Sequence, residues 1–181
     1  MVSILIDDDL ILRSFTPEDA PSLFRAVDES RAHLRPWLRW VDATTKQEHI
    51  QQFIQRTMQQ LNDQRALELG IVLNREIIGG LGMHEWDHMH KKAQVGYWIR
   101  KEHEGKGIVT RCLNRFLDFL FEKPGLNKIE IQFVPGNKRS AAIAQKLGFK
   151  IEGVLRQSYS MNGKLDDLVI TGMLKNEWDA K

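Results

Sequence analysis

A glycine-rich turn between an expected strand and an expected helix is the part of this sequence best suited to binding chemistry. Glu104-Gly105-Lys106-Gly107 follows Ile99 and precedes an apolar helical pattern that begins near Thr110. Two glycines let the backbone approach a ligand closely. The first turn of the helix adds unpaired N–H groups and the positive end of its dipole, so the junction could bind phosphate or diphosphate. Lys106 and Thr110 could supply a charge and a hydroxyl, although an ordinary loop before a helix would show the same glycines.

Two nucleotide-binding motifs can be compared with this turn. A P-loop requires Gly-x-x-x-x-Gly-Lys-Ser/Thr, which the segment does not contain. A dinucleotide fingerprint requires a third glycine, where Val109 or Arg111 stands, although Glu130 could take the place of the ribose-binding acid. A Rossmann fold uses two β-α-β halves and only one such unit is expected here, so the dinucleotide alternative is disfavoured.

The hydrophobic pattern indicates which elements position this turn. Alternating apolar residues predict strands and three-to-four spacing predicts helices. Asn74-Arg75 and Asn162-Gly163 are expected to be tight hairpin turns, Thr16-Pro17 a helix start, and Asn137 a helix N-cap. We expect strands at 10–15, 67–73, 77–83, 95–99, 129–133, 150–161 and 164–174, and helices at 16–28, 45–62, 109–120 and 137–147.

This order of elements predicts a single α/β (α+β) domain over residues 1–181. A mostly antiparallel meander joins one β-α-β crossover, which favours a central mixed sheet with helices on both faces. No internal repeat or flexible linker divides the chain.

Composition and charge exclude several classes of protein. The 181 residues contain 26 Lys and Arg against 24 Asp and Glu, a net charge of +2, which argues against a dedicated nucleic-acid binder. One cysteine, Cys112, excludes a disulfide framework within the chain. His84, His88 and His90 lack a second ligand cluster, so no metal site is expected. No secretory signal and no apolar run of ~20 residues is visible, which predicts a cytoplasmic protein with no membrane partner.

Three motifs in order resemble the GNAT acetyltransferase superfamily over residues 10–174. The segment 95–110, with Val95-Gly96-Tyr97-Trp98-Ile99 and the glycine turn, resembles its acyl-CoA pyrophosphate motif. Asn137-Lys138-Arg139-Ser140, Lys146-Leu147-Gly148-Phe149 and the segment 152–156 resemble its second motif. Leu34-Arg35-Pro36-Trp37-Leu38 is similar to the Rim-type branch, the ribosomal-protein alanine and serine N-acetyltransferases.

The resemblance implies acetyl-CoA as co-substrate, held in a gap where two neighbouring strands splay apart. A fixed amide donor at the acetyl oxygen could stabilise the transition state by ~3 kcal/mol. Glu104 and Val109 depart from the family pattern, and an acid beside a diphosphate is unfavourable unless its side chain points to solvent. By the resemblance, the pantetheine and diphosphate contacts fall on Trp98, Ile99, Glu104, Gly105, Lys106, Gly107, Ile108, Val109, Thr110, Asn137 and Ser140.

Two of the candidate catalytic groups, Ser140 and Tyr159, follow from the same resemblance. Ser140 could protonate the departing thiolate, or could be only a serine at the start of a helix. The base position of Rim-type enzymes falls on Tyr159, a poor base at its usual pKa of about 10. Glu85 and His84 are the other candidate bases, and His84 could equally be a surface histidine. Cys112 lies on an apolar helical stripe and is expected to be a core residue.

The segment with Trp37 and Trp40 is the expected acceptor end. These tryptophans, beside Arg35 and Arg39, could wall a slot for a peptide N-terminus and attract an acidic chain, or could be core of a packed loop. The resemblance implies direct transfer of acetyl to a primary amine, first a ribosomal-protein N-terminus, in a possible homodimer. A small-molecule amine acetyltransferase and a non-catalytic acyl-CoA-binding module are the alternatives.

Overall fold

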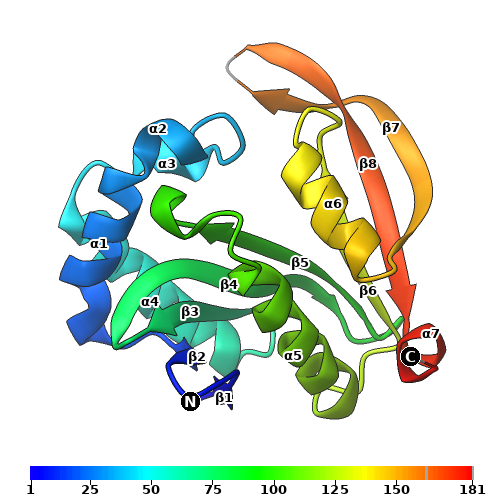
Figure 1. The fold of residues 1–181 in the computed structure, drawn as a ribbon, viewed down its shortest axis with the longest axis horizontal. Coiled ribbons are helices and arrows are strands. Elements are labelled where there is room, and N and C mark those ends of the chain that lie inside the picture. The colour runs from blue at the N-terminus through cyan, green and yellow to red at the C-terminus, as the bar shows by residue number, and fades with distance from the viewer. Residues whose placement is uncertain (162, 181) are drawn as a thin grey trace.

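The computed structural model describes residues 1–161 and 163–180 (Figure 1). Its strands are β1 (Ser3–Leu5), β2 (Leu10–Ser14), β3 (Leu67–Leu73), β4 (Glu76–Asp87), β5 (Lys92–Ile99), β6 (Lys128–Phe133), β7 (Lys150–Met161) and β8 (Lys164–Leu174). Its α-helices are α1 (Ala20–Glu29), α2 (Arg31–Leu34), α3 (Trp40–Ala43), α4 (Gln47–Asn62), α5 (Ile108–Glu122), α6 (Lys138–Lys146) and α7 (Lys175–Asp179). Short 3-10 turns, η1 (Pro17–Asp19) and η2 (Lys101–His103), precede α1 and α5.

The described strands form one eight-stranded sheet in the order β1-β2-β3-β4-β5-β6-β8-β7. Every pairing is antiparallel except that of β5 with β6, which the α5 crossover connects. The predicted mixed, mostly antiparallel sheet is therefore confirmed, and β7 forms one of its edges.

The parallel pairing of β5 and β6 is short. Only Lys92, Ala93 and Gln94 pair with β6, although β5 continues to Ile99. Beyond Gln94 the two strands separate, while β5 stays paired with β4 through Ile99. The edge of β5 that faces β6 is therefore left without strand partners over 95–99, which is the splay that the resemblance implied.

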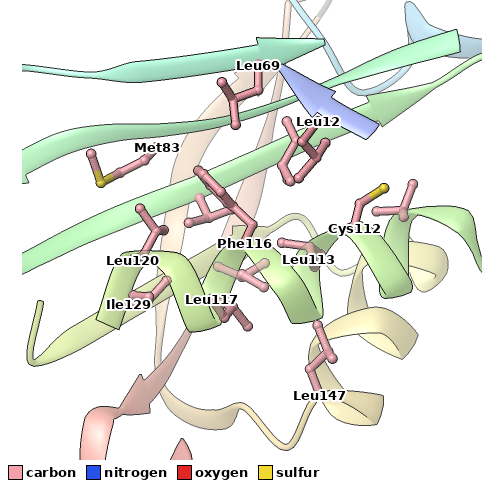
Figure 2. Packing of buried hydrophobic residues seen from close by; sticks show 14 of the residues in the cluster. Leu12, Leu69, Met83, Cys112, Leu113, Phe116, Leu117, Leu120, Ile129 and Leu147 are labelled. Carbon is pink, nitrogen blue, oxygen red and sulfur yellow. The ribbon is translucent and has the colours of Figure 1, made fainter. Parts of the chain in front are cut away.

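Helices cover both faces of the sheet, as predicted (Figure 1). On one face, Cys112, Leu113 and Phe116 of α5 pack against Leu12 and Leu69 of the sheet (Figure 2). The other face is covered by α1 and α4, whose apolar residues form a second cluster with Phe15, Val72 and Ile77. Burying a side chain such as Phe116, which is 0% exposed, contributes ~1.5–3 kcal/mol to the free energy of folding. None of the helices in the described part of the chain is long and apolar enough to cross a membrane.

The predicted hairpin turn between β3 and β4 is confirmed in detail. Asn74 and Arg75 both have positive φ, 49° and 70°, as a two-residue turn of the primed type requires. In the second expected turn, Asn162 lies outside the described residues. Pattern analysis missed β1, α2, α3 and α7, which have 3, 4, 4 and 5 residues and are too short to show a period.

A half-buried carboxyl on the face of the sheet covered by α4 gives the fold a pH-dependent stability. Glu68 of β3 pairs with Gly82 of β4, and a side chain at Gly82 would clash with the Glu68 carboxyl. Burial raises the pKa of Glu68 from 4.5 to about 7, with the positive charge of Arg56 opposing the shift. The folded state therefore keeps a proton that the unfolded chain releases near pH 4.5, so the free energy of unfolding falls as pH rises from 4.5 to 7.

Glu68→Gln should remove this penalty, since glutamine does not ionise. We expect the variant to exceed the wild type in free energy of unfolding by roughly 3 kcal/mol at pH 8, with the difference closing below pH 4.5. Urea unfolding at a series of pH values measures it. Glu122→Gln, a change at an exposed carboxyl, is the control and should show no such trend. If the variant and the wild type differed in free energy of unfolding by the same amount at pH 4 and at pH 8, ionisation of Glu68 would be ruled out as the cause.

Candidate functional site

A cavity of about 510 Å³ lies where β5 separates from β6. Residues from β5, the glycine turn and the first turn of α5 form one wall, and α6 with the end of β6 forms another. The end of α2 and the loop that follows it also line the cavity. Of the residues assigned above to CoA, those lining the cavity are Trp98, Ile99, Glu104, Gly105, Gly107, Ile108, Val109, Thr110, Asn137 and Ser140; Lys106 does not.

The glycine turn has the geometry of an anion site. Gly105 and Gly107 have φ of 75° and 72°, the left-handed region that glycine adopts without strain, and Gly107 is the N-cap of α5. The helix begins with a bond from the Arg111 N–H to the Gly107 carbonyl, 3.1 Å long. The N–H groups of Ile108 to Thr110 thus have no acceptor within the helix and lie at its positive end.

A diphosphate bound at this turn would favour a Glu104 side chain that points to solvent, but the side chain points into the cavity. Its side chain is 15% exposed and lines the cavity, where it forms ion pairs with Lys101 at 2.8 Å and with Arg139, and lies 3.7 Å from the His33 imidazole. Burial would raise the pKa of Glu104, but the Lys101 hydrogen bond and the charges of Arg139 and His33 outweigh it and lower the pKa. The negative charge in the turn is therefore matched by cations from η2 and α6.

Ser140 lies in the first turn of α6 and is 8% exposed. Its N–H donates to Oδ1 of Asn137 at 3.2 Å, which confirms Asn137 as the helix cap. Its Oγ lies 2.9 Å from the hydroxyl of Tyr97, a β5 residue that also lines the cavity. Burial raises the pKa of Tyr97 to about 12, with the hydrogen bond to Ser140 opposing. Sequence reasoning missed Tyr97, although it stands within the motif, because the contact joins residues 43 positions apart.

The expected acceptor end contains Tyr159 and Trp37, which both line the cavity. The Tyr159 hydroxyl donates to the Trp37 carbonyl at 3.2 Å, and the Arg39 guanidinium lies 4.3 Å from the centre of the Tyr159 ring. Trp40 is not part of the cavity wall: it packs edge-on against Trp98 with ring centres 5.9 Å apart.

The two other base candidates are not part of the cavity wall. Glu85 is exposed and accepts a hydrogen bond from Gln94, and its φ is 52°. His84 is partly buried near Gly96, and burial lowers the pKa of its imidazole despite the neighbouring Glu85 charge. Neither residue lines the cavity.

Cys112 and His90, which could take part in chemistry by residue type, have structural contacts instead. Cys112 is fully buried in the α5 core, where burial raises the pKa of its thiol to about 12, in agreement with a core role. His90 pairs with Asp87 at 2.7 Å, and the residues that the structure describes contain no group of three potential metal ligands.

The arrangement combines a glycine turn with the geometry of an anion site, an unpaired strand edge and hydroxyl groups in one cavity. Glu104 is the only carboxylate among the described residues that line it, and it is already ion-paired. Such a site can bind a long nucleotide thioester and protonate a leaving group, but it presents no free carboxylate to act as a base.

Comparisons with known proteins agree with this geometry. Residues 9–150 match the family model described as "Acetyltransferase (GNAT) domain". The chain is 31% identical over 185 aligned positions, covering 100% of both chains, to "Putative ribosomal N-acetyltransferase YdaF" of Bacillus subtilis strain 168. The crystal structure of the ribosomal-protein-S5-alanine acetyltransferase from Vibrio fischeri has a TM-score of 0.91 at 25% identity, covering 98% of this chain and 99% of that one.

A second solved structure is the Microcin C7 self immunity acetyltransferase MccE in complex with acetyl-CoA and AMP. It has a TM-score of 0.89 at 26% identity and covers 93% of this chain and 94% of its own. The family match spans well over half of the residues, from before β2 to the start of β7. The chain therefore belongs to the GNAT acetyltransferase family.

Proposed function

We propose that this protein transfers the acetyl group of acetyl-CoA directly to a primary amine, with a protein N-terminal amine as the acceptor. One observation carries the proposal: a single cavity joins the glycine turn, the unpaired edge of β5 and the Ser140 hydroxyl. The MccE structure contains acetyl-CoA, and this chain shares its fold over 93% of its length.

The backbone supplies the binding groups. The N–H groups at the start of α5 would hold the diphosphate, and pantetheine would lie along the free edge of β5 at Trp98 and Ile99 as a partial strand. A backbone N–H on this edge could donate to the thioester oxygen, where negative charge develops in the transition state. Because these donors belong to the main chain, the departures at Glu104 and Val109 leave them intact.

Ser140 is the proposed acid. The amine nitrogen forms a bond to the carbonyl carbon, the carbon–sulfur bond breaks, and the thiolate takes the hydroxyl proton. Among the described residues that line the cavity, no carboxylate is free to accept the proton of the amine. Water therefore takes the proton of the acceptor amine. The hydrogen bond from the Tyr159 hydroxyl to the Trp37 carbonyl would hold Trp37 in place at the acceptor end of the cavity. The use of Tyr159 as a base stays a prediction.

The acceptor follows from the charges near the Trp37 end of the cavity. Arg39, stacked on Tyr159, favours an acceptor with acidic residues over a cationic polyamine, because the described residues that line the cavity include no unpaired carboxylate to bind a second cation. Both YdaF and the Vibrio fischeri enzyme carry names that refer to ribosomal proteins. A homodimer also stays a prediction.

Mass spectrometry of acceptors tests the proposal. The purified protein is incubated with acetyl-CoA and either ribosomal proteins with free N-termini or spermidine, and thiol release is followed in parallel. We expect acetylation at an N-terminal amine. Rapid acetylation of spermidine with unmodified N-termini would move the acceptor to small amines, and no thiol release with any amine would leave only an acyl-CoA-binding module.

Glu104→Gln should tighten CoA binding. The change removes a negative charge from the diphosphate site and frees Lys101 and Arg139 to face the phosphates. We expect the Kd for CoA to fall about threefold to tenfold at low salt, with a smaller change at high salt because screening weakens charge interactions. Calorimetry measures it, with Glu122→Gln as the exposed control. Weaker binding by the variant would instead mean that these ion pairs hold the turn in its binding conformation.

A further inference from the structure

The hydroxyl of Tyr97 and the hydroxyl of Ser140 form a pair inside the cavity, one from β5 and one from α6. We propose that Tyr97 is a positioning residue that donates its proton to Ser140 Oγ and thereby leaves the serine proton directed at the departing sulfur. The inference rests on the proposed acid role of Ser140 and extends it to a residue that does not itself touch the reacting atoms.

The number of hydroxyl protons decides which of the two residues donates in the hydrogen bond between Tyr97 and Ser140. Each hydroxyl has one proton to donate, so a Ser140 that donated to Tyr97 would have none left for a thiolate. Tyr97 has two acceptors within reach, Oγ at 2.9 Å and the Ser140 carbonyl at 3.5 Å. The shorter distance is that of a good O–H···O bond and the longer one is not, which favours donation to Oγ.

Burial keeps this donor in place. The raised pKa of Tyr97, about 12, means that the phenol stays protonated across the neutral range and does not become an acceptor-only phenolate. Ser140 is fixed from its other side, since its N–H is bonded to the Asn137 cap. The Oγ atom is therefore held between two elements, with its own proton as the remaining donor.

The bond strengthens when the proton leaves. As the carbon–sulfur bond breaks, the Ser140 proton moves to sulfur and the serine oxygen gains negative charge. A hydrogen bond to a charged oxygen is roughly twice as strong as one between neutral groups. The bond from Tyr97 to Ser140 Oγ therefore stabilises the transition state more than the ground state. The acceptor nitrogen, now part of the amide, loses its extra proton to water, and water returns a proton to Ser140.

Steady-state kinetics of Tyr97→Phe, Ser140→Ala and the double variant test the inference. Phenylalanine keeps the ring in the cavity wall and removes only the hydroxyl. We expect kcat of Tyr97→Phe to fall roughly tenfold, as the loss of one hydrogen bond implies, with KM for acetyl-CoA within about twofold of the wild type. Tyr97→Phe should cause no further loss in the Ser140→Ala background, because the two residues act as one unit.

The outcomes separate the inference from the function on which it rests. Full activity of Ser140→Ala would remove the acid role itself. Loss in Ser140→Ala with none in Tyr97→Phe, or independent losses that multiply in the double variant, would overturn only the role of Tyr97. Calorimetric CoA affinity and thermal unfolding of each variant show whether the fold and the cofactor site are intact. A raised KM with unchanged kcat in Tyr97→Phe would also overturn the positioning role of Tyr97, because it would mean that the hydroxyl acts in binding and not in the chemical step.

Discussion

Gly107→Pro is expected to raise the Kd for CoA by at least about a hundredfold, because the proposed diphosphate site depends on the backbone of this residue. Gly107 has φ of 72°, whereas proline fixes φ near −65° and has no N–H. The substitution must therefore rotate the backbone at the N-cap of α5 and redirect the N–H groups of the first turn. Loss of two or more phosphate contacts, each charge-assisted, accounts for the size of the effect.

Gly125→Pro is the matched control for this variant. Gly125 also has positive φ, 67°, is exposed, and lies in the loop between α5 and β6, away from the cavity. Both substitutions impose the same kind of backbone strain, so both are expected to lower the melting temperature, but only the change at Gly107 should affect calorimetric CoA binding. Wild-type affinity in Gly107→Pro would show that the diphosphate binds elsewhere.

Ser140→Ala is expected to lower kcat by roughly a hundredfold, the lower end of the usual contribution of a general acid, with little change in CoA affinity. The thiolate of CoA would then have to leave without a proton or take one from water. Acetyl transfer under saturating acetyl-CoA gives kcat, and calorimetry gives the Kd for CoA. The expected signature is a change in kcat without a change in binding.

Ser22→Ala separates the chemical role of Ser140 from its position in a helix. Ser22 is the third residue of α1, as Ser140 is the third residue of α6, and its Oγ donates to the Asp19 carbonyl at 3.0 Å outside the cavity. Loss of a hydroxyl at this helix position costs both variants a similar, small amount of stability. If Ser140→Ala and Ser22→Ala had the same activity as the wild type, Ser140 would be only a serine at the start of a helix.

Local chemistry explains why much of the fold could be predicted from the sequence. The glycines at 105 and 107, the Asn74-Arg75 turn and the Asn137 cap each act within a few residues, so their consequences can be inferred from neighbours alone. The long strands and helices show their periods over seven or more residues. The order of these elements then restricts the sheet to a mixed arrangement with one crossover.

Long-range contacts explain what could not be predicted. The Tyr97–Ser140 pair and the Glu104–Arg139 ion pair join residues that are distant in sequence, so no local pattern marks them. Trp40 resembled Trp37 as a candidate for the acceptor end, yet α3 turns it against Trp98 and out of the cavity wall. Glu85 was a plausible base by residue type, but it lies in the irregular end of β4 and does not line the cavity.

The three paired positions between β5 and β6 have a thermodynamic consequence for the whole chain. In the described part of the chain, strand pairing between the two halves of the sheet is confined to those positions, and the remaining contact between the halves is side-chain packing in the core around α5. A molecule that bridges the two strands within the gap binds only while the halves are together. By linkage, its binding free energy adds to the stability of the native state, and a shortage of acetyl-CoA would leave the protein easier to unfold.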